Sequence, residues 1–123
     1  MVTDEELRKA AWRAATKAYA PYSRFYVGAA ALFEDGKIYC GANVENKSYG
    51  LTICAERAAI FSGIAAGQRK LTRLAVCSLA ADVKPCGACL QVISEFADSD
   101  TPILLGDHDV CVLKTLFPHP FEL

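Results

Sequence analysis

The pattern of apolar positions predicts a helix at the start of the chain. Apolar residues recur at helical spacing up to Ala18, behind a capping box formed by Thr3 and Glu6. Pro21 lacks the backbone N–H that a continuing helix needs. We therefore expect a helix over about residues 4–19.

The rest of the chain alternates between extended and helical patterns. Residues 25–33 and 37–44 are rich in aromatic, β-branched and small residues and flank an Asp-Gly pair, which predicts a β-hairpin. The later predicted elements are a helix over 54–66, a buried strand over 71–79, a helix over 86–97, strands over 102–105 and 110–112, and a turn over 114–117. This order predicts a three-layer α/β/α fold in which helices cover both faces of one mixed sheet of about five strands.

Length, charge and composition limit the number of domains and the class of partner that we expect. A chain of 123 residues provides for one domain, residues 1–123, with a single core. The net charge of −1 offers no basic surface for nucleic acid or a membrane, so we expect a small-molecule partner. The acidic start lacks the features of a secretion signal, and no apolar run approaches the ~20 residues of a membrane span. We expect a cytoplasmic protein.

Three of the six cysteines lie at predicted helix starts. Cys54 begins the second helix, and Cys86 and Cys89 begin the third. Residues three apart on a helix are neighbours, and the positive end of the helix dipole favours thiolates. Three sulfur ligands on a tetrahedral Zn²⁺ leave the fourth position for water, which is the arrangement of a catalytic zinc site.

Two charged residues follow Cys54 directly. Glu56 is a candidate general acid/base beside a zinc-activated water. Positions two apart on a regular helix point about 200° apart, so this carboxylate must reach along the helix start. Arg57, with the two helix N-termini, is a candidate to offset the negative charge of three thiolates.

Two other readings of the cysteines stay open on the residues alone. Cys86-x-x-Cys89 resembles a thioredoxin-type redox pair, although too few residues follow it for the usual sheet and helix. A structural four-thiolate zinc would recruit Cys40, Cys77 or Cys111. Those three lie in apolar, strand-like surroundings, where a free cysteine behaves as a small hydrophobe, so we favour catalytic zinc.

Four blocks of residues, spread over nearly the whole chain, carry a resemblance to a known family. They are Tyr19–Ser23 with Phe25 and Val27–Ala30, Asn43–Asn46 with Ser48–Gly50, Cys54–Ala58, and Pro85–Cys89 with Gln91 and Val92. The Cys-x-Glu and Pro-Cys-x-x-Cys pair is a general signature of zinc deaminases. In order and spacing the chain resembles the small homotetrameric cytidine deaminases.

The resemblance implies an activity and a set of site residues. It implies a hydrolase of pyrimidine salvage that deaminates cytidine or deoxycytidine to the uridine product, with ammonia release and one Zn²⁺ per subunit. The implied roles are zinc ligation by Cys54, Cys86 and Cys89, proton transfer by Glu56, hydrogen bonds to ribose from Asn43 and Glu45, stacking on the base by Phe25, a backbone contact of Ala55 with the pyrimidine oxygen, and contacts across the interfaces of a homotetramer with shared sites by Tyr49 and Phe121.

Simpler roles compete for the substrate residues. From pattern alone Phe25 suits a hairpin core equally well, and Asn43 and Glu45 lie at a strand end where turn capping is usual. Tyr49 and Phe121 are more often packing residues than ligand contacts.

Two departures from the family pattern lie beside the expected metal site. Leu90 stands where the family has an arginine that helps to neutralise the ligand thiolates, and the loop over residues 80–84 is about one residue shorter. A deaminase of a modified or different amino-heterocycle nucleoside or base is therefore an alternative. A non-catalytic zinc-binding interaction module is an alternative of another class.

Overall fold

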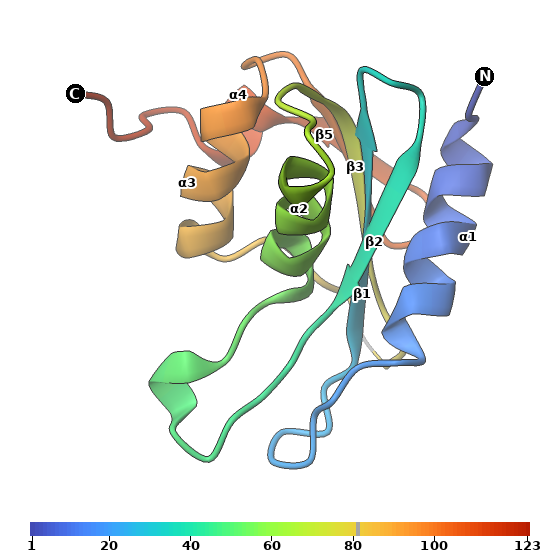
Figure 1. Ribbon diagram of the computed structural model, residues 1–123, viewed down its shortest axis with the longest axis vertical. Coiled ribbons are helices and arrows are strands. Elements are labelled where there is room, and N and C mark those ends of the chain that lie inside the picture. The colour runs from blue at the N-terminus through green and yellow to red at the C-terminus, as the bar shows by residue number, and fades with distance from the viewer. Residues whose placement is uncertain (81) are drawn as a thin grey trace.

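A five-stranded mixed sheet separates one helix from three others in the computed structural model, which describes residues 1–80 and 82–123 (Figure 1). The strands are β1 (Val27–Phe33), β2 (Ile38–Ala42), β3 (Leu71–Ser78), β4 (Pro102–Leu105) and β5 (Asp109–Val112), in the order β2-β1-β3-β4-β5. Only the β3–β4 pair is parallel among these. Helix α1 (Asp4–Ala15) covers one face, and α2 (Ala55–Ala65), α3 (Gly87–Phe96) and α4 (Leu113–Leu116) cover the other. The predicted three-layer α/β/α fold is confirmed.

Helix α1 ends four residues earlier than the apolar pattern predicts. The capping box forms as expected, but the helix stops at Ala15, where the Thr16 hydroxyl donates to a carbonyl of the last turn at 2.6 Å. Tyr19 is then extended, because its N–H donates to the Asn43 carbonyl (2.9 Å) and its carbonyl accepts from the Glu45 N–H (2.8 Å). Pairing with a distant segment overrides the local helical pattern.

The hairpin and the remaining elements lie where the sequence places them. β1 and β2 pair antiparallel across a turn in which Gly36 has a φ of 78° and the Asp35 carboxylate accepts from the Lys37 N–H at 2.9 Å. All seven residues of β1 are buried, because helices cover both of its faces. The short 3-10 helix η1 (Tyr49–Leu51) is an addition that the sequence pattern does not predict.

Two glycines allow helices to lie directly on the strands. A Cβ at Gly41 of β2 would lie 2.3 Å from the backbone nitrogen of Ala59 in α2, and one at Gly28 of β1 would lie 2.0 Å from the Ala11 carbonyl oxygen in α1. Real Cβ atoms do not come so close to backbone, so only glycine fits at either position. The contact at Gly41 sets the position of α2 against the sheet.

The starts of α2 and α3 lie at the same end of the molecule (Figure 1). Cys54 and Cys86 are the N-cap residues of these helices, and Gly67 ends the turn after α2 with a φ of 100°. The loops over residues 19–26 and 43–54 extend beyond that end of the sheet (Figure 1). None of the helices described by the structure is long and apolar enough to cross a membrane.

Candidate metal centre

Three cysteine sulfurs converge where α2 and α3 begin. Cys54 precedes the first turn of α2, and Cys86 and Cys89 occupy the N-cap and third positions of α3. The Sγ atoms of Cys54 and Cys86 lie 3.9 Å apart, those of Cys86 and Cys89 lie 3.5 Å apart, and all three lie within 4.8 Å of one another. The predicted cluster is therefore present.

The spacing of these sulfurs fits a zinc ion. Tetrahedral coordination with Zn–S bonds of about 2.3 Å places sulfurs about 3.8 Å apart. A disulfide would need about 2.05 Å, and all three cysteines are free. Among the described residues, no fourth Cys, His, Asp or Glu ligand atom joins the group. The protein thus offers three sulfur ligands and leaves a fourth position for another molecule.

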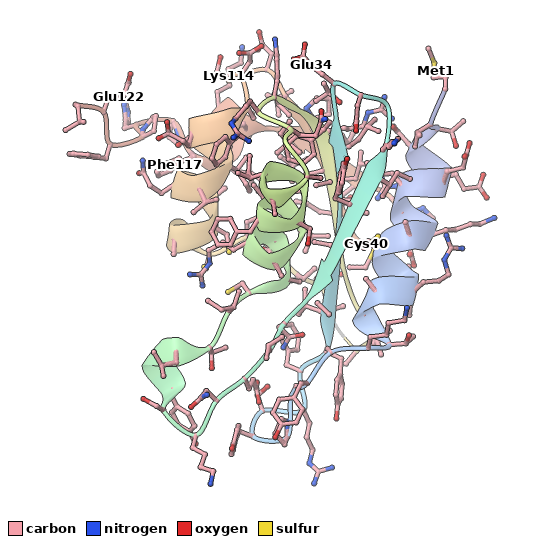
Figure 2. All side chains as sticks on the ribbon, in the orientation of Figure 1. Met1, Glu34, Cys40, Lys114, Phe117 and Glu122 are labelled. Carbon is pink, nitrogen blue, oxygen red and sulfur yellow. The ribbon has the colours of Figure 1, made fainter. Side chains whose placement is uncertain are left out.

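The other cysteines lie away from this cluster. Cys40 and Cys77 face α1 on the opposite side of the sheet, with their sulfurs near the carbonyls of Ala10 and Arg8. Figure 2 labels Cys40 on β2, on the side of α1. Cys111 lies on the edge strand β5. All three lie on strands, as expected, but Cys40 is exposed, because β2 is the other edge strand of the sheet.

A guanidinium group and a neighbouring thiol stabilise negative charge on Cys54. A hydrogen bond from the Cys89 thiol and the Arg57 guanidinium, whose Nη2 lies 3.4 Å from the Cys54 sulfur, both stabilise the Cys54 thiolate. Together they lower the pKa of Cys54 to about 5, although burial acts in the opposite direction. The same hydrogen bond raises the pKa of Cys89, the proton donor, and burial raises it further. Arg57 thus lies where its positive charge can offset the negative charge of the cysteine thiolates, as the sequence predicts.

Glu56 is buried beside the cysteines, with 3% of its surface exposed. Burial, and then the negative charge of Cys54, raise the pKa of its carboxyl group to about 7. The expected difficulty of aiming this side chain does not arise, because Cys54 is not helical: its φ of −74° and ψ of 153° are extended. The side chains of Cys54 and Glu56 are therefore not separated by the 200° that two positions on a regular helix would give.

Asn43 and Glu45 both make hydrogen bonds within the protein. The Asn43 amide accepts from the Val27 N–H and donates to the Phe25 carbonyl, both at 2.8 Å. One Glu45 carboxylate oxygen accepts from the N–H groups of Tyr22 (3.0 Å) and Ser23 (3.1 Å). The turn-capping role considered for these residues is therefore present.

The aromatic candidates lie on the surface of the protomer. Phe25, at the base of the loop over residues 19–26, is 37% exposed, so it is not simply part of the hairpin core. Tyr49 is 75% exposed and meets the Tyr22 ring edge-on at a centroid distance of 6.0 Å. Phe121 is 69% exposed on the C-terminal tail, where Figure 2 labels the neighbouring Glu122. Packing within the protomer does not account for Tyr49 or Phe121.

Leu90 belongs to the apolar core between the sheet and the helices α2 and α3. It is 9% exposed and follows Cys89 on the first turns of α3. Leu90 therefore contributes apolar packing and no charge beside the cysteines. The shortened loop over residues 80–84 includes residue 81, which lies outside the described residues.

Ser23 also belongs to this region, although the sequence pattern gives it no site role. Its hydroxyl donates to the Glu45 carboxylate and accepts from the Phe25 N–H at 3.0 Å. A serine two residues before its N–H donor is a known turn motif, so the spacing of Ser23 and Phe25 was the available signal. The bond to Glu45 joins residues 22 positions apart and has no local signal.

Comparison with known proteins agrees with this geometry. Residues 1–105 match the family described as the cytidine and deoxycytidylate deaminase zinc-binding region. Cytidine deaminase from Sporosarcina psychrophila is 44% identical over 123 residues, covering 96% of this chain and 90% of that protein. The one from Mycobacterium tuberculosis is 50% identical over 120 residues, covering 95% and 88%. The crystal structure of cytidine deaminase from Burkholderia pseudomallei has a TM-score of 0.91 at 45% identity, covering 98% and 100%. This chain belongs to the cytidine and deoxycytidylate deaminase zinc-binding family.

Proposed function

We propose that residues 1–123 form one catalytic domain that hydrolytically deaminates cytidine and deoxycytidine to uridine and deoxyuridine, releasing ammonia. The observation that carries this proposal is a three-sulfur cluster with a buried, proton-accepting carboxyl group beside it. Cytidine deaminases at 44–50% identity over most of the chain support the choice of substrate. Free nucleosides as substrates fit a cytoplasmic role in pyrimidine salvage.

Cys54, Cys86 and Cys89 would hold one Zn²⁺ per subunit. When bound, zinc lowers the pKa of water and so makes it a nucleophile at neutral pH. Three thiolates carry more negative charge than the divalent ion carries positive charge. Arg57, 3.4 Å from the Cys54 sulfur, and the N-termini of α2 and α3 offset the difference.

Glu56 moves the protons of the reaction. It takes a proton from the water that attacks C4 of the cytosine ring and delivers it to N3. It then takes the proton of the new C4 hydroxyl group and passes it to the amino group, the C4–N bond breaks to leave a C4 carbonyl, and ammonia leaves. A carboxyl group with a pKa of about 7 can both accept and donate protons at neutral pH, which this shuttle requires.

The remaining hydrogen-bonding capacity of Asn43 and Glu45 suits a sugar hydroxyl. A carboxylate has about four lone-pair sites, and Glu45 uses three of them on Tyr22 and Ser23. Asn43 has donated one of its two amide hydrogens to the protein. One acceptor site on Glu45 and one donor on Asn43 are among those left, and a ribose hydroxyl can engage both. Phe25 would stack on the base, and the Ala55 N–H at the start of α2 would meet the pyrimidine oxygen.

Neighbouring copies of the chain would complete the site in a homotetramer. Tyr49 and Phe121 are exposed aromatic residues on a loop and a tail that extend from the body of the protomer (Figure 1). Other large apolar residues exposed on the loops over residues 19–26 and 43–54 are Tyr19, Tyr22, Val44 and Leu51. Sedimentation velocity tests the assembly, and a monomer with full activity would refute shared sites.

The decisive experiment combines metal analysis with ammonia release. We expect one zinc per chain and ammonia from cytidine and deoxycytidine at comparable rates. Glu56→Gln should keep zinc and lose about 10²- to 10⁴-fold in kcat, the usual contribution of general acid/base catalysis. Glu34→Gln, an exposed glutamate in the hairpin turn at the opposite end of the molecule, is the matched control (Figure 2).

A substrate panel separates the proposal from its alternatives. Leu90, which places core packing where the family has a charge, is the observation that favours a modified base. Inactivity on cytidine and deoxycytidine together with ammonia release from a substituted cytosine nucleoside would support that alternative. Bound zinc without ammonia release from any member of the panel would support a non-catalytic zinc module.

A further inference from the structure

We propose that Ser23 is a positioning residue that joins the ribose-binding carboxylate of Glu45 to the backbone of Phe25. The proposal rests on the proposed function, because it takes Phe25 and Glu45 as substrate contacts. It assigns to Ser23 a share of substrate affinity without any contact between Ser23 and the substrate.

The Ser23 hydroxyl lies in the middle of a continuous hydrogen-bond chain. It donates to one oxygen of the Glu45 carboxylate and accepts from the N–H of Phe25 at 3.0 Å. The other oxygen of Glu45 accepts from the N–H groups of Tyr22 and Ser23 at 3.0 and 3.1 Å. One carboxylate thereby holds the loop over residues 21–25, which we call the Phe25 loop.

Asn43 binds the other backbone polar group of Phe25, its carbonyl. Its amide donates to the Phe25 carbonyl at 2.8 Å and accepts from the Val27 N–H at 2.8 Å. Both backbone polar groups of Phe25 are therefore bound by side chains, one through Ser23 and one through Asn43. Because Asn43 and Glu45 also belong to the ribose subsite, the sugar contacts and the ring of Phe25 form one connected unit.

Arg24 shows that this loop is held in a conformation it would not adopt alone. Its φ of 57° lies in the left-handed region, which is costly for a residue with a side chain. Such outliers persist where surrounding contacts over-determine the backbone. The contacts here are the Arg24 N–H to the Ala20 carbonyl at 2.9 Å and the bonds of Ser23 on the preceding residue.

Pre-organisation of Phe25 should affect the affinity for the substrate and not the rate of the proton-transfer steps. A ring held in its stacking position loses little conformational freedom when the substrate arrives, which strengthens binding. The proton transfers occur at Glu56, which lies on a different element, α2. Loss of the Ser23 hydroxyl should therefore raise KM and leave kcat nearly unchanged, which a general loss of stability would not do.

The test compares Ser23→Ala with Ser23→Thr, which keeps the hydroxyl, in the zinc-loaded protein. We expect Ser23→Ala to raise KM for cytidine about tenfold, the effect of losing a charge-assisted hydrogen bond, with kcat within about twofold of wild type. Hydrogen exchange of the Phe25 amide should accelerate in the same variant. Ser23→Thr should restore both values. Ser62→Ala, which removes an exposed hydroxyl bonded to Ala58 on α2, should change neither.

Three outcomes would overturn the proposal. They are an unchanged KM in Ser23→Ala, a parallel fall in kcat, and a Ser23→Thr variant that behaves like Ser23→Ala. Ammonia release by the wild-type protein is measured first. Its absence would refute the proposed function and not the hydrogen-bond chain, which the exchange rate of the Phe25 amide in Ser23→Ala then decides alone.

Discussion

Cys77 and Cys54, which lie on opposite faces of the sheet, have opposite acid–base chemistry. On the α1 face, Cys77 has its pKa raised to about 11, mainly by burial. On the face covered by α2 and α3, Cys54 has its pKa lowered to about 5, mainly by the hydrogen bond from Cys89 and, against burial, by Arg57. The same residue type is thus a neutral packing group at Cys77 and a thiolate at Cys54.

Burial alone does not explain which cysteines belong to the metal cluster. Cys77 is 1% exposed and Cys89 is fully buried, yet only Cys89 belongs to the metal cluster. The Cys77 thiol faces the carbonyl oxygens of Arg8 and Gly106 at 3.8 and 3.9 Å, and acceptors stabilise a protonated thiol. The cluster lies instead at two helix N-termini beside a guanidinium group. The donors around a sulfur, not its depth, decide whether it can bind metal.

The largest effect on zinc binding and activity should come from removing a sulfur of the metal cluster, and removing a sulfur on the α1 face is the comparison. Cys89→Ala should lose zinc and more than about 10⁴-fold in kcat, because zinc is what brings the pKa of water from 15.7 to about 7. Cys77→Ala should keep one zinc per chain and nearly full activity. Metal analysis of both purified variants, with ammonia release, measures this. Zinc retention by Cys89→Ala would contradict the assignment of the site.

The second prediction concerns the carboxyl group buried on the α2 face. In the zinc-free protein the Glu56 pKa of about 7 exceeds its ordinary 4.5, so the folded state binds the proton more tightly than the unfolded state. The resulting stability is fully present below pH 4.5 and is lost as pH rises through 7, by roughly 3 kcal/mol.

Urea unfolding of chelator-treated protein between pH 4.5 and 8 measures this loss. Glu56→Gln cannot titrate, so its free energy of unfolding should fall by roughly 3 kcal/mol less than that of the wild type over the same range. Parallel pH profiles of the two proteins would show that Glu56 does not have a raised pKa.

A third comparison uses the two glycines on which the helices rest. Gly41→Ala and Gly28→Ala should each cost about 1–3 kcal/mol of stability, because the new methyl group meets backbone at 2.3 and 2.0 Å. Only Gly41→Ala displaces α2, so it alone should also weaken zinc binding, by about tenfold. Competition with a zinc chelator and thermal melts would measure both effects. Equal zinc affinity in the two variants would mean that the packing of α2 on β2 does not position the sulfurs.

The smallest effect is expected in thiol alkylation of the zinc-free protein. With a pKa of about 5, Cys54 is already a thiolate at pH 6, so its rate of reaction with iodoacetamide should change by less than about 1.2-fold up to pH 8. The rate at Cys77, with a pKa of about 11, should rise with pH throughout. Mass spectrometry of the labelled peptides distinguishes the sites. A steep rise for Cys54 would contradict its lowered pKa.

Much of the fold was predictable because its signals are local. The capping box of Thr3 and Glu6, the turn at Gly36 and the end of α2 at Gly67 each depend on neighbouring residues, and all lie where expected. The end of α1 was not predictable, because Tyr19 pairs with a segment more than 20 residues away. The exposure of Cys40 depends on which strand lies at the edge of the sheet, and periodicity within a strand carries no such information.

The sequence by itself predicted which three cysteines cluster and which carboxyl group lies beside them, because motif spacing at helix starts is a local property. Tertiary structure alone decided that the three sulfurs at the two helix starts lie within 4.8 Å of one another, that Glu56 is buried after an extended Cys54, and that Ser23 connects Glu45 to Phe25. Each of these depends on contacts between residues distant in the chain or on a backbone conformation that packing selects. Such contacts exist only once the chain has folded.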